Sequence, residues 1–241
     1  MSRADYPMTT RERGVFAAYL AILLTIIAIA ACSGCAGRFM AGDIPSASDP
    51  SVARLVVVKD GKEEGYCTVF KVGENLAMTA GHCCGDDEDD LDKMLNEMLG
   101  IKPKKHVMTY HAQGPHAVPG AALEVLHDDD DHDVCIMRGR LRGAPLMLAF
   151  HDPALGARVW TAGYPMTELL FSEGLWSGRT EDDNNSKASV AVWGGASGSP
   201  VMDGAGRVVG VLRAYHPPMS NFSLIAPLEW LRAAMSLTQQ P

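Results

Sequence analysis

The chain has 241 residues, of which 47% are hydrophobic and 7% aromatic, and its formal net charge is −8. This length predicts one globular domain with an appendage, and the hydrophobic content is ordinary for a globular protein. The negative charge argues against a nucleic-acid-binding protein, which would need clustered lysines and arginines. Much of the acidic charge lies in residues 85–93 and 127–133, so the rest of the domain is closer to neutral.

The N-terminus carries the features of an export signal. Residues 15–31 hold no charge, and two arginines precede them. As a helix this segment would rise about 25 Å, which is short for crossing a bilayer. The tetrapeptide IAAC, ending at Cys32, resembles a bacterial lipobox, which would place a lipid on that sulfur. We expect residues 1–31 to be a signal peptide or an uncleaved membrane anchor, and 32–50 to be a linker. In both cases the domain would be exported and tethered to the cell-envelope membrane, on the periplasmic or extracellular face.

Six cysteines fit that compartment, because disulfides persist where the environment is oxidising. Two of them, Cys32 and Cys35, belong to the anchor region. The folded part holds an even number, which allows three pairings: Cys67, Cys83, Cys84 and Cys135. The adjacent cysteines have no C-x-x-C spacing, and no second pair is suitably placed for zinc. Disulfides are therefore the better interpretation.

Short runs rich in β-branched and aromatic residues follow the linker, and turn residues separate them. We predict strands over 53–59, 65–72, 75–80, 106–112, 121–127, 133–139, 145–150, 157–165, 174–180, 188–193, 207–215 and 221–227. Apolar residues at helical spacing predict two helices, a short insertion over 89–100 and a C-terminal helix over 228–237. A dozen strands without long helices between them imply an all-β barrel or sandwich.

Three residues carry nucleophilic chemistry when taken together. His82 ends a predicted strand, Asp133 opens another, and Ser197 lies between small residues in the stretch GGASGSP. A serine hydroxyl is a poor nucleophile that needs a neighbouring base, histidine is the natural base near neutral pH, and a buried carboxylate fixes its tautomer. The glycines of that stretch let two backbone N–H groups, those of Gly195 and Ser197, converge on an oxyanion.

The motifs TAGHC, HDVCIM and GASGSP, in the chain order His, Asp, Ser, resemble the trypsin-like, chymotrypsin-fold serine proteases of bacterial type. The similarity covers residues 51–236 and leaves 237–241 as a tail. It implies two six-stranded antiparallel β-barrels, with His82 and Asp133 from the first and Ser197 from the second. It also implies a serine endopeptidase that forms an acyl-enzyme on protein or peptide substrates and requires no cofactor.

The resemblance extends to the cysteines. Cys67 and Cys83 have the spacing of the disulfide that staples the histidine loop in this family. Cys84 and Cys135 then remain, either as a second bridge or as two free buried thiols.

By the same resemblance, the substrate pocket has Ala191 at its base with Val192 and Trp193 beside it, and the opposite wall runs over Leu212, Arg213, Ala214 and Tyr215. No acid lies at the base, so we expect small or apolar P1 residues rather than Lys or Arg. Arg213 stands where the family more often has Ser or Thr. It would either attract acidic side chains or point to solvent, and we expect solvent.

Two departures from the vertebrate members stand out. The IVGG-like activation sequence is absent, and Ala196 replaces the aspartate that would pair with a newly released N-terminus. We therefore expect a preformed oxyanion hole without a zymogen switch. The acidic stretches 85–92 and 127–133 could bind a divalent cation, but solvated loops are the expectation and we assign no metal ligand. The alternative function is a catalytically silent binding module that keeps the fold on a membrane-tethered lipoprotein.

Overall fold

A computed structural model describes residues 51–85, 98, 106–115, 117–179, 184–215 and 222–238. The chain divides into two units, Met1–Gly42 and Asp43–Pro241, and the described residues all belong to the second. Several predictions therefore lie outside the described residues: the signal or anchor segment, its lipidation site Cys32, the linker, the helical insertion except for position 98, and the end of the tail.

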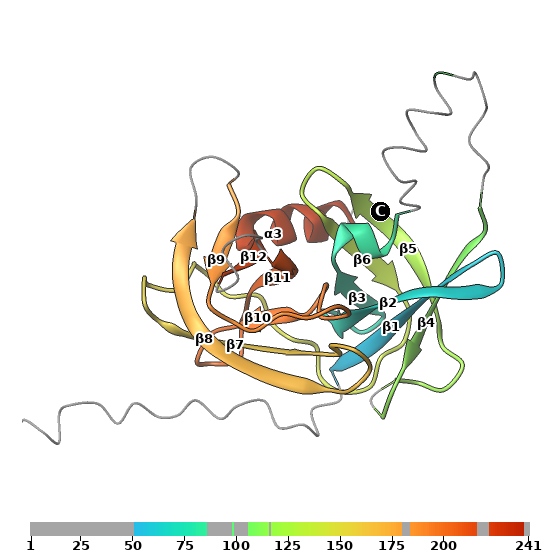
Figure 1. Cartoon of the computed structure of the whole chain (residues 1–241), viewed down its shortest axis with the longest axis horizontal. Coiled ribbons are helices and arrows are strands. Elements are labelled where there is room, and N and C mark those ends of the chain that lie inside the picture. Colours follow the sequence, from blue (N-terminus) through green and yellow to red (C-terminus); the bar gives the residue numbers. More distant parts are fainter. Residues whose placement is uncertain are drawn as a thin grey trace, which may run out of the picture. The chain divides into compact units, whose positions relative to one another are not determined.

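The described strands form two closed antiparallel barrels of six strands each, as predicted (Figure 1). The first closes in the order β1(Val52–Lys59), β2(Lys62–Lys71), β3(Leu76–Thr79), β6(Val134–Arg138), β5(Ala122–Asp129), β4(Met108–Gln113). The second closes in the order β10(Pro200–Met202), β11(Val208–Tyr215), β12(Ser223–Pro227), β9(Ser186–Ala188), β8(Leu170–Arg179), β7(Arg158–Gly163). Closure leaves no unpaired sheet edge, which suits a small all-β domain.

One predicted strand is absent, one was misplaced, and one strand was missed. The strand predicted over 188–193 overlaps β9(Ser186–Ala188) only at Ala188. Residues 145–150 form no strand: Leu148 makes a single bridge to Val208, while the side chains of Met147 and Phe150 are 70% and 79% exposed. Conversely, β10 was not predicted, because it has only three residues and begins with Pro200. A proline at the start of so short a run gives no strand signal. The alternation of apolar residues therefore gave the right number of strands, but it predicted one that is absent, misplaced another and missed β10.

The C-terminal helix α3(Leu228–Leu237) lies where the sequence predicts it. Its buried residues are Leu228, Leu231 and Ala234, one helical face, and the helix contacts strands of both barrels. Among the residues that the structure describes, no helix combines the length and apolar character that crossing a membrane requires.

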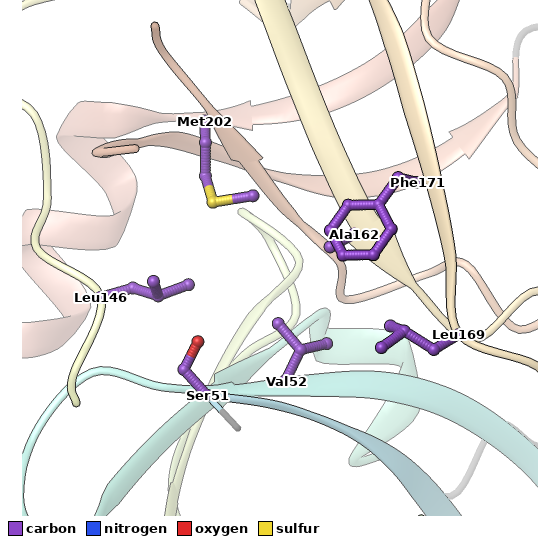
Figure 2. Close-up of a pocket in the computed structure, with 7 residues that line it drawn as sticks. All are labelled: Ser51, Val52, Leu146, Ala162, Leu169, Phe171 and Met202. Carbon is purple, nitrogen blue, oxygen red and sulfur yellow. The ribbon is translucent and has the colours of Figure 1, made fainter. Parts of the chain in front are cut away.

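A small apolar cavity of about 10 Å³ lies where the two barrels meet (Figure 2). Val52 of β1 faces Ala162 of β7, Phe171 of β8 and Met202 of β10 across it. A space of this size holds one water molecule at most, so the seam between the barrels is nearly filled.

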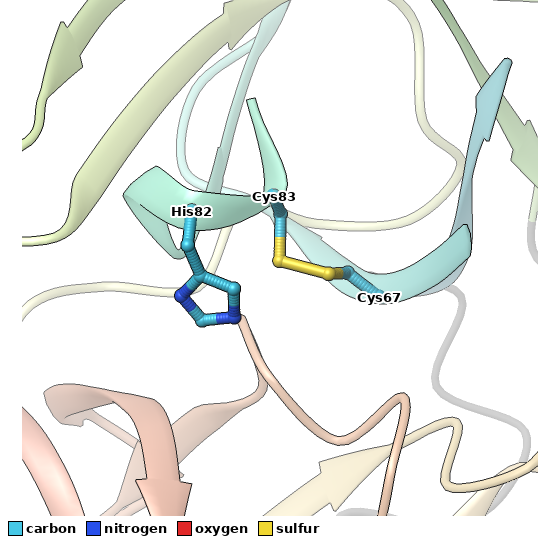
Figure 3. Close-up of side chains that lie close together, drawn as sticks. All are labelled: Cys67, His82 and Cys83. Atoms are coloured by element: carbon cyan, nitrogen blue, oxygen red, sulfur yellow. A yellow bond between two sulfur atoms is a disulfide. The ribbon is translucent and has the colours of Figure 1, made fainter. Parts of the chain in front are cut away.

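Two disulfides join the segments around His82 to the first barrel. Cys67 of β2 is bonded to Cys83 in the short 3₁₀ helix η1(Gly81–Cys83), which confirms the predicted bridge (Figure 3). Cys84 is bonded to Cys135 of β6, so the second alternative, two free thiols, is wrong. Both bridges therefore hold the turn that carries His82 against neighbouring strands.

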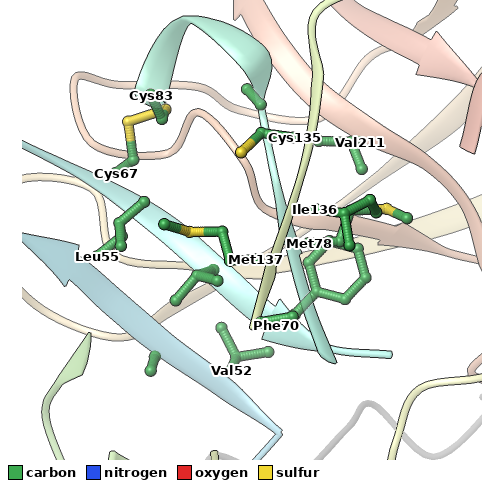
Figure 4. Close-up of a cluster of buried hydrophobic side chains, with 14 of the residues drawn as sticks. Val52, Leu55, Cys67, Phe70, Met78, Cys83, Cys135, Ile136, Met137 and Val211 are labelled. Carbon is green, nitrogen blue, oxygen red and sulfur yellow. A yellow bond between two sulfur atoms is a disulfide. The ribbon is translucent and has the colours of Figure 1, made fainter. Parts of the chain in front are cut away.

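The hydrophobic core is continuous from the first barrel into the second. Side chains of the first barrel such as Phe70, Met78 and Ile136 belong to one buried cluster with the disulfide cysteines, and Val211 of β11 belongs to the same cluster (Figure 4). Because one apolar cluster is shared, the barrels cannot shift without opening their common core. This rigid contact fixes the relative positions of residues contributed by the two barrels.

Candidate active site

His82 and Asp133 meet at one end of the first barrel, as the sequence predicts. His82 Nδ1 lies 2.9 Å from Asp133 Oδ1, and the backbone N–H of His82 donates to the same oxygen at 2.8 Å. A carboxylate only accepts hydrogen bonds, so the imidazole proton sits on Nδ1. The carboxylate thus fixes the tautomer whose basic nitrogen is Nε2.

The backbone holds Asp133 in an unusual conformation. Its φ is +54°, in the left-handed region that side-chain-bearing residues rarely adopt, and the residue is only 7% exposed. A Cβ added to Gly81 would lie 2.9 Å from the Cα of Asp133. Gly81 therefore lets the turn of His82 approach the backbone of Asp133 closely.

The second carboxylate oxygen of Asp133 accepts a hydrogen bond from Arg213. Arg213 Nε donates to Asp133 Oδ2 at 2.7 Å, and Arg213 Nη1 donates to Asn185 Oδ1 at 2.7 Å. The side chain of Arg213 is 22% exposed. The expectation that it points to solvent was wrong, because a buried carboxylate 2.7 Å away is a stronger partner than water.

These contacts decide the charge state of Asp133. Burial alone would raise the pKa of the Asp133 carboxyl, but the hydrogen bonds and charge of His82 and the hydrogen bond from Arg213 outweigh it. The pKa of Asp133 is therefore held below its ordinary value of 3.8. The carboxylate stays ionised under the imidazole at neutral pH.

Ser197 lies on a tight turn of the second barrel. Gly195 and Gly198 on either side of it have φ values of +92° and +83°. A Cβ on Gly198 would overlap the carbonyl oxygen of Thr68 at 2.1 Å, so this position also requires glycine for space. The hydroxyl of Ser197 donates to the backbone carbonyl of Arg213 at 2.9 Å.

The predicted oxyanion donors are aimed by neighbouring backbone hydrogen bonds. The N–H of Met166 donates to the carbonyl of Gly194 at 2.8 Å, and the N–H of Ser199 donates to the carbonyl of Ala196 at 3.0 Å. Because the two ends of a trans peptide point in opposite directions, these bonds orient the N–H groups of Gly195 and Ser197. Neither N–H donates to another described residue.

Thr68 connects the nucleophile turn to the first barrel, and sequence reasoning missed it. Its hydroxyl donates to the carbonyl of Gly195 at 2.9 Å and accepts the N–H of Tyr164 at 2.8 Å. Its own N–H donates to the carbonyl of Ser197 at 2.7 Å. In the sequence, this threonine stands next to Cys67 inside an ordinary strand pattern, so nothing in the motif marks it.

A cavity of about 80 Å³ lies beside the nucleophile turn. Ala191, Trp193 and Ala196 line it on one side, and residues of β7 and β8 line the other. None of the described residues that line it has an ionisable side chain. Its lining includes the hydroxyl of Ser199, which is buried and has no hydrogen-bond partner in the described part of the protein.

The other predicted pocket residues divide into two groups. Val192 packs partly buried against the core of the second barrel, and Leu212 is completely buried in that core, so its assignment to a pocket wall was wrong. Ala214 and Tyr215 belong to β11 and pair with Leu224 and Ser223 of β12, and their side chains lie outside the description.

The acidic segment ahead of Asp133 forms its own local contacts. His132 Nδ1 lies 2.8 Å from Asp129 Oδ2, a hydrogen-bond contact between residues three positions apart. Among the described residues, the one cluster with ligand-like spacing is Cys67, His82 and Cys83. Its two sulfurs form a disulfide (Figure 3), so neither is a thiolate that could bind a metal ion.

A family model described as the trypsin-like peptidase domain matches residues 65–211, which is more than half of the chain. The chain belongs to the trypsin-like peptidase family. The matched region contains His82, Asp133 and Ser197 together with the strands that carry them. No curated protein matches the sequence.

Solved structures of trypsin-like proteases share the fold. The active form of the protease Rv3671c from M. tuberculosis matches with a TM-score of 0.63 and 17% identity, over 85% of this chain and 88% of that chain. The serine endoprotease from Yersinia pestis matches with a TM-score of 0.61 and 13% identity, over 78% of this chain and 62% of that chain. The HtrA-type protease AlgW, solved with a tripeptide, matches with a TM-score of 0.61 and 16% identity, over 81% of this chain and 62% of that chain.

This chain thus spans less than two thirds of the length of the last two proteins. At these identities the likeness concerns the fold. Family and fold together support a protease that acts on proteins or peptides.

Proposed function

We propose that this protein is a serine endopeptidase in which His82, Asp133 and Ser197 form the catalytic triad. The observation that carries the proposal is the carboxylate of Asp133, which binds His82 Nδ1 at 2.9 Å and so directs Nε2 to act as the base. The shared core of the barrels supports it further, because it holds the turns of His82 and Ser197 in a fixed relation.

In the proposed reaction, the hydroxyl of Ser197 leaves the carbonyl of Arg213 and turns to His82. Hydrogen bonds between catalytic groups are often loose before substrate binds. The Ser197 oxygen then attacks the substrate carbonyl carbon while His82 Nε2 takes its proton. His82 returns that proton to the leaving amine as the peptide bond breaks, which produces the acyl-enzyme. His82 then takes a proton from water as the water attacks the ester, and it passes that proton to the Ser197 oxygen when the second product leaves.

The negative charge that develops on the substrate oxygen would be bound by the N–H groups of Gly195 and Ser197. Both belong to peptides whose carbonyls are already anchored, by Met166 and Ser199, so they need little reorganisation during the reaction. Ala196 is buried without an ionic partner, which fits a hole that forms without an activating cleavage.

We further propose a preference for small or apolar P1 residues. The support is the uncharged character of the cavity next to Ala191 and Trp193, which offers no partner to a lysine or arginine side chain.

Export and attachment to a membrane are part of the same proposal. The N-terminal apolar segment and Cys32 motivate attachment. Two disulfides in the described domain support an oxidising compartment, because such bonds are rare in the reducing cytosol.

The test is cleavage of a peptide library by the full chain, purified in detergent without reducing agent, with Ser197→Ala as the matched control. We expect internal peptide bonds to be cut after small or apolar residues, and only by the unsubstituted protein. No cleavage by either protein would favour the silent binding module, and equal product patterns from both would contradict the assignment of Ser197 as the nucleophile.

A further inference from the structure

Arg213 reaches Asp133 because of an irregularity in β11. The pairing of β11 with β12 shifts register between Leu212 and Ala214, so Arg213 occupies a bulge. A bulge turns a side chain away from the regular alternation of a strand. Here it directs the guanidinium toward the first barrel, where Nε donates to Asp133 Oδ2 at 2.7 Å.

Two further contacts hold the guanidinium in place. Its Nη1 donates to Asn185, and its carbon lies 5.9 Å from the ring centroid of Trp230 on α3. The ring of that tryptophan also contacts the ring of His132, with 4.6 Å between the two centroids, and His132 is paired with Asp129. A guanidinium held by an acceptor and an aromatic ring keeps one orientation.

Each oxygen of the Asp133 carboxylate therefore has its own donor. Oδ1 accepts the two N–H groups of His82, and Oδ2 accepts Nε of Arg213. A carboxylate that accepts hydrogen bonds at both oxygens cannot rotate freely about its Cβ–Cγ bond. Its orientation under His82 is thus set by a residue of the second barrel.

The positive charge of the Arg213 guanidinium also changes the electrostatic environment of the His82 ring. An ionised carboxylate beside an imidazole favours the protonated ring, and a positive charge on the far side of that carboxylate opposes this. The charged and titratable groups around Asp133 are His82 from η1, Arg213 from β11, and the His132–Asp129 pair beyond Trp230. Asn185 contributes a neutral amide.

We propose that Arg213 is a positioning residue of the proposed protease: it fixes the Asp133 carboxylate and offsets its charge, so that His82 stays unprotonated, and peptide cleavage persists, at lower pH. This inference rests on the triad proposed above. It concerns a residue that acts through Asp133 and does not touch the reacting atoms.

The first test compares pH profiles of kcat/KM for the unsubstituted protein and Arg213→Gln, which keeps a donor and removes the charge. We expect the acidic limb to move to higher pH by about one unit, which lowers kcat/KM about tenfold on that limb. Arg213→Lys keeps the charge but not the geometry of the guanidinium. Its acidic limb should therefore stay in place, while the plateau value of kcat/KM falls. Arg158→Gln is the matched control, because Arg158 on β7 is exposed and, among the described residues, pairs only with Glu173 on β8, so its profile should stay unchanged.

A uniform loss at every pH in Arg213→Gln, without a shift of the limb, would show a merely structural role and overturn the proposal. A second measurement needs no activity: NMR titration of the His82 ring in the Ser197→Ala background. Arg213→Gln should raise the midpoint of that titration, and an unchanged midpoint contradicts the charge role. If the midpoint moves while neither protein cleaves peptides, the failure belongs to the proposed function and not to Arg213.

Discussion

The hydroxyl of Thr68, in the first barrel, donates a hydrogen bond to the carbonyl of Gly195, in the nucleophile turn of the second, at 2.9 Å. Thr68 is completely buried, and the same hydroxyl accepts the N–H of Tyr164. One side chain thus satisfies two backbone groups that no other described residue serves. The relationship links the position of the oxyanion donors to the packing of the first barrel.

Replacing Thr68 with valine should therefore damage both stability and activity. The variant keeps the shape but leaves the N–H of Tyr164 and the carbonyl of Gly195 without partners, which costs about 1–3 kcal/mol for each unsatisfied buried group. Urea unfolding and kcat measure the two effects. Thr68→Ser retains the hydroxyl and should recover most of kcat. If valine and serine behave alike, the hydrogen bond does not orient the turn.

Alanine at Gly195 should abolish most of the activity. Its Cβ would lie 2.4 Å from a ring carbon of Tyr66 and 2.6 Å from the carbonyl oxygen of Tyr164, and φ is +92°. Moving this peptide displaces an oxyanion donor, and loss of one such donor lowers kcat about 10²- to 10³-fold. Steady-state kinetics measure the change. Gly204→Ala is the control, since nothing lies within 4 Å of its added Cβ, and it should match the unsubstituted protein.

The two disulfides should contribute unequally to stability. The cysteines of the Cys84–Cys135 bridge are 51 positions apart in the sequence and those of Cys67–Cys83 are 16 apart, so removing the first bridge frees a longer loop. Chain entropy predicts losses of about 4 and 3 kcal/mol for the paired alanine variants. Urea unfolding without reductant gives both values. A larger loss for the shorter loop would mean that native packing, and not the loop, dominates.

Asp133 should make the protein less stable in acid. Its pKa in the folded state lies below the ordinary 3.8, so its ionisation favours folding fully above pH 3.8. That contribution disappears as the pH falls from 3.8 through the lower folded pKa. Asp133→Asn cannot titrate, so the difference in unfolding free energy between it and the unsubstituted protein should shrink across this window. Parallel pH curves for the two proteins would rule out a depressed pKa for Asp133.

Much of the fold was accessible from local sequence signals. Alternating β-branched runs separated by glycines gave twelve strands and an all-β class, and the apolar face of 228–237 gave α3. The error at 145–150 has a physical reason: an apolar run becomes a strand only where a partner edge exists, and Leu148 meets only Val208. Burial and partners are properties of the whole fold, not of the run.

In the candidate site, too, residues marked by local motifs could be predicted, and residues that depend on distant partners could not. His82, Asp133 and Ser197 stood in motifs with turn residues around them, so their positions could be predicted. Arg213 and Thr68 could not, because their partners lie 80 and 127 residues away and their strands look ordinary. The orientation of Arg213 depends on a bulge in β11, which changes one residue's direction without a distinctive sequence.

The most direct test of the central claim is the covalent reaction of the full chain with a fluorophosphonate under oxidising conditions. Intact mass spectrometry and peptide mapping should show one adduct, located on Ser197, and its formation should slow sharply in His82→Ala and vanish in Ser197→Ala. An unmodified protein, or an adduct that persists when Ser197 is replaced, would contradict the assignment of Ser197 as the nucleophile.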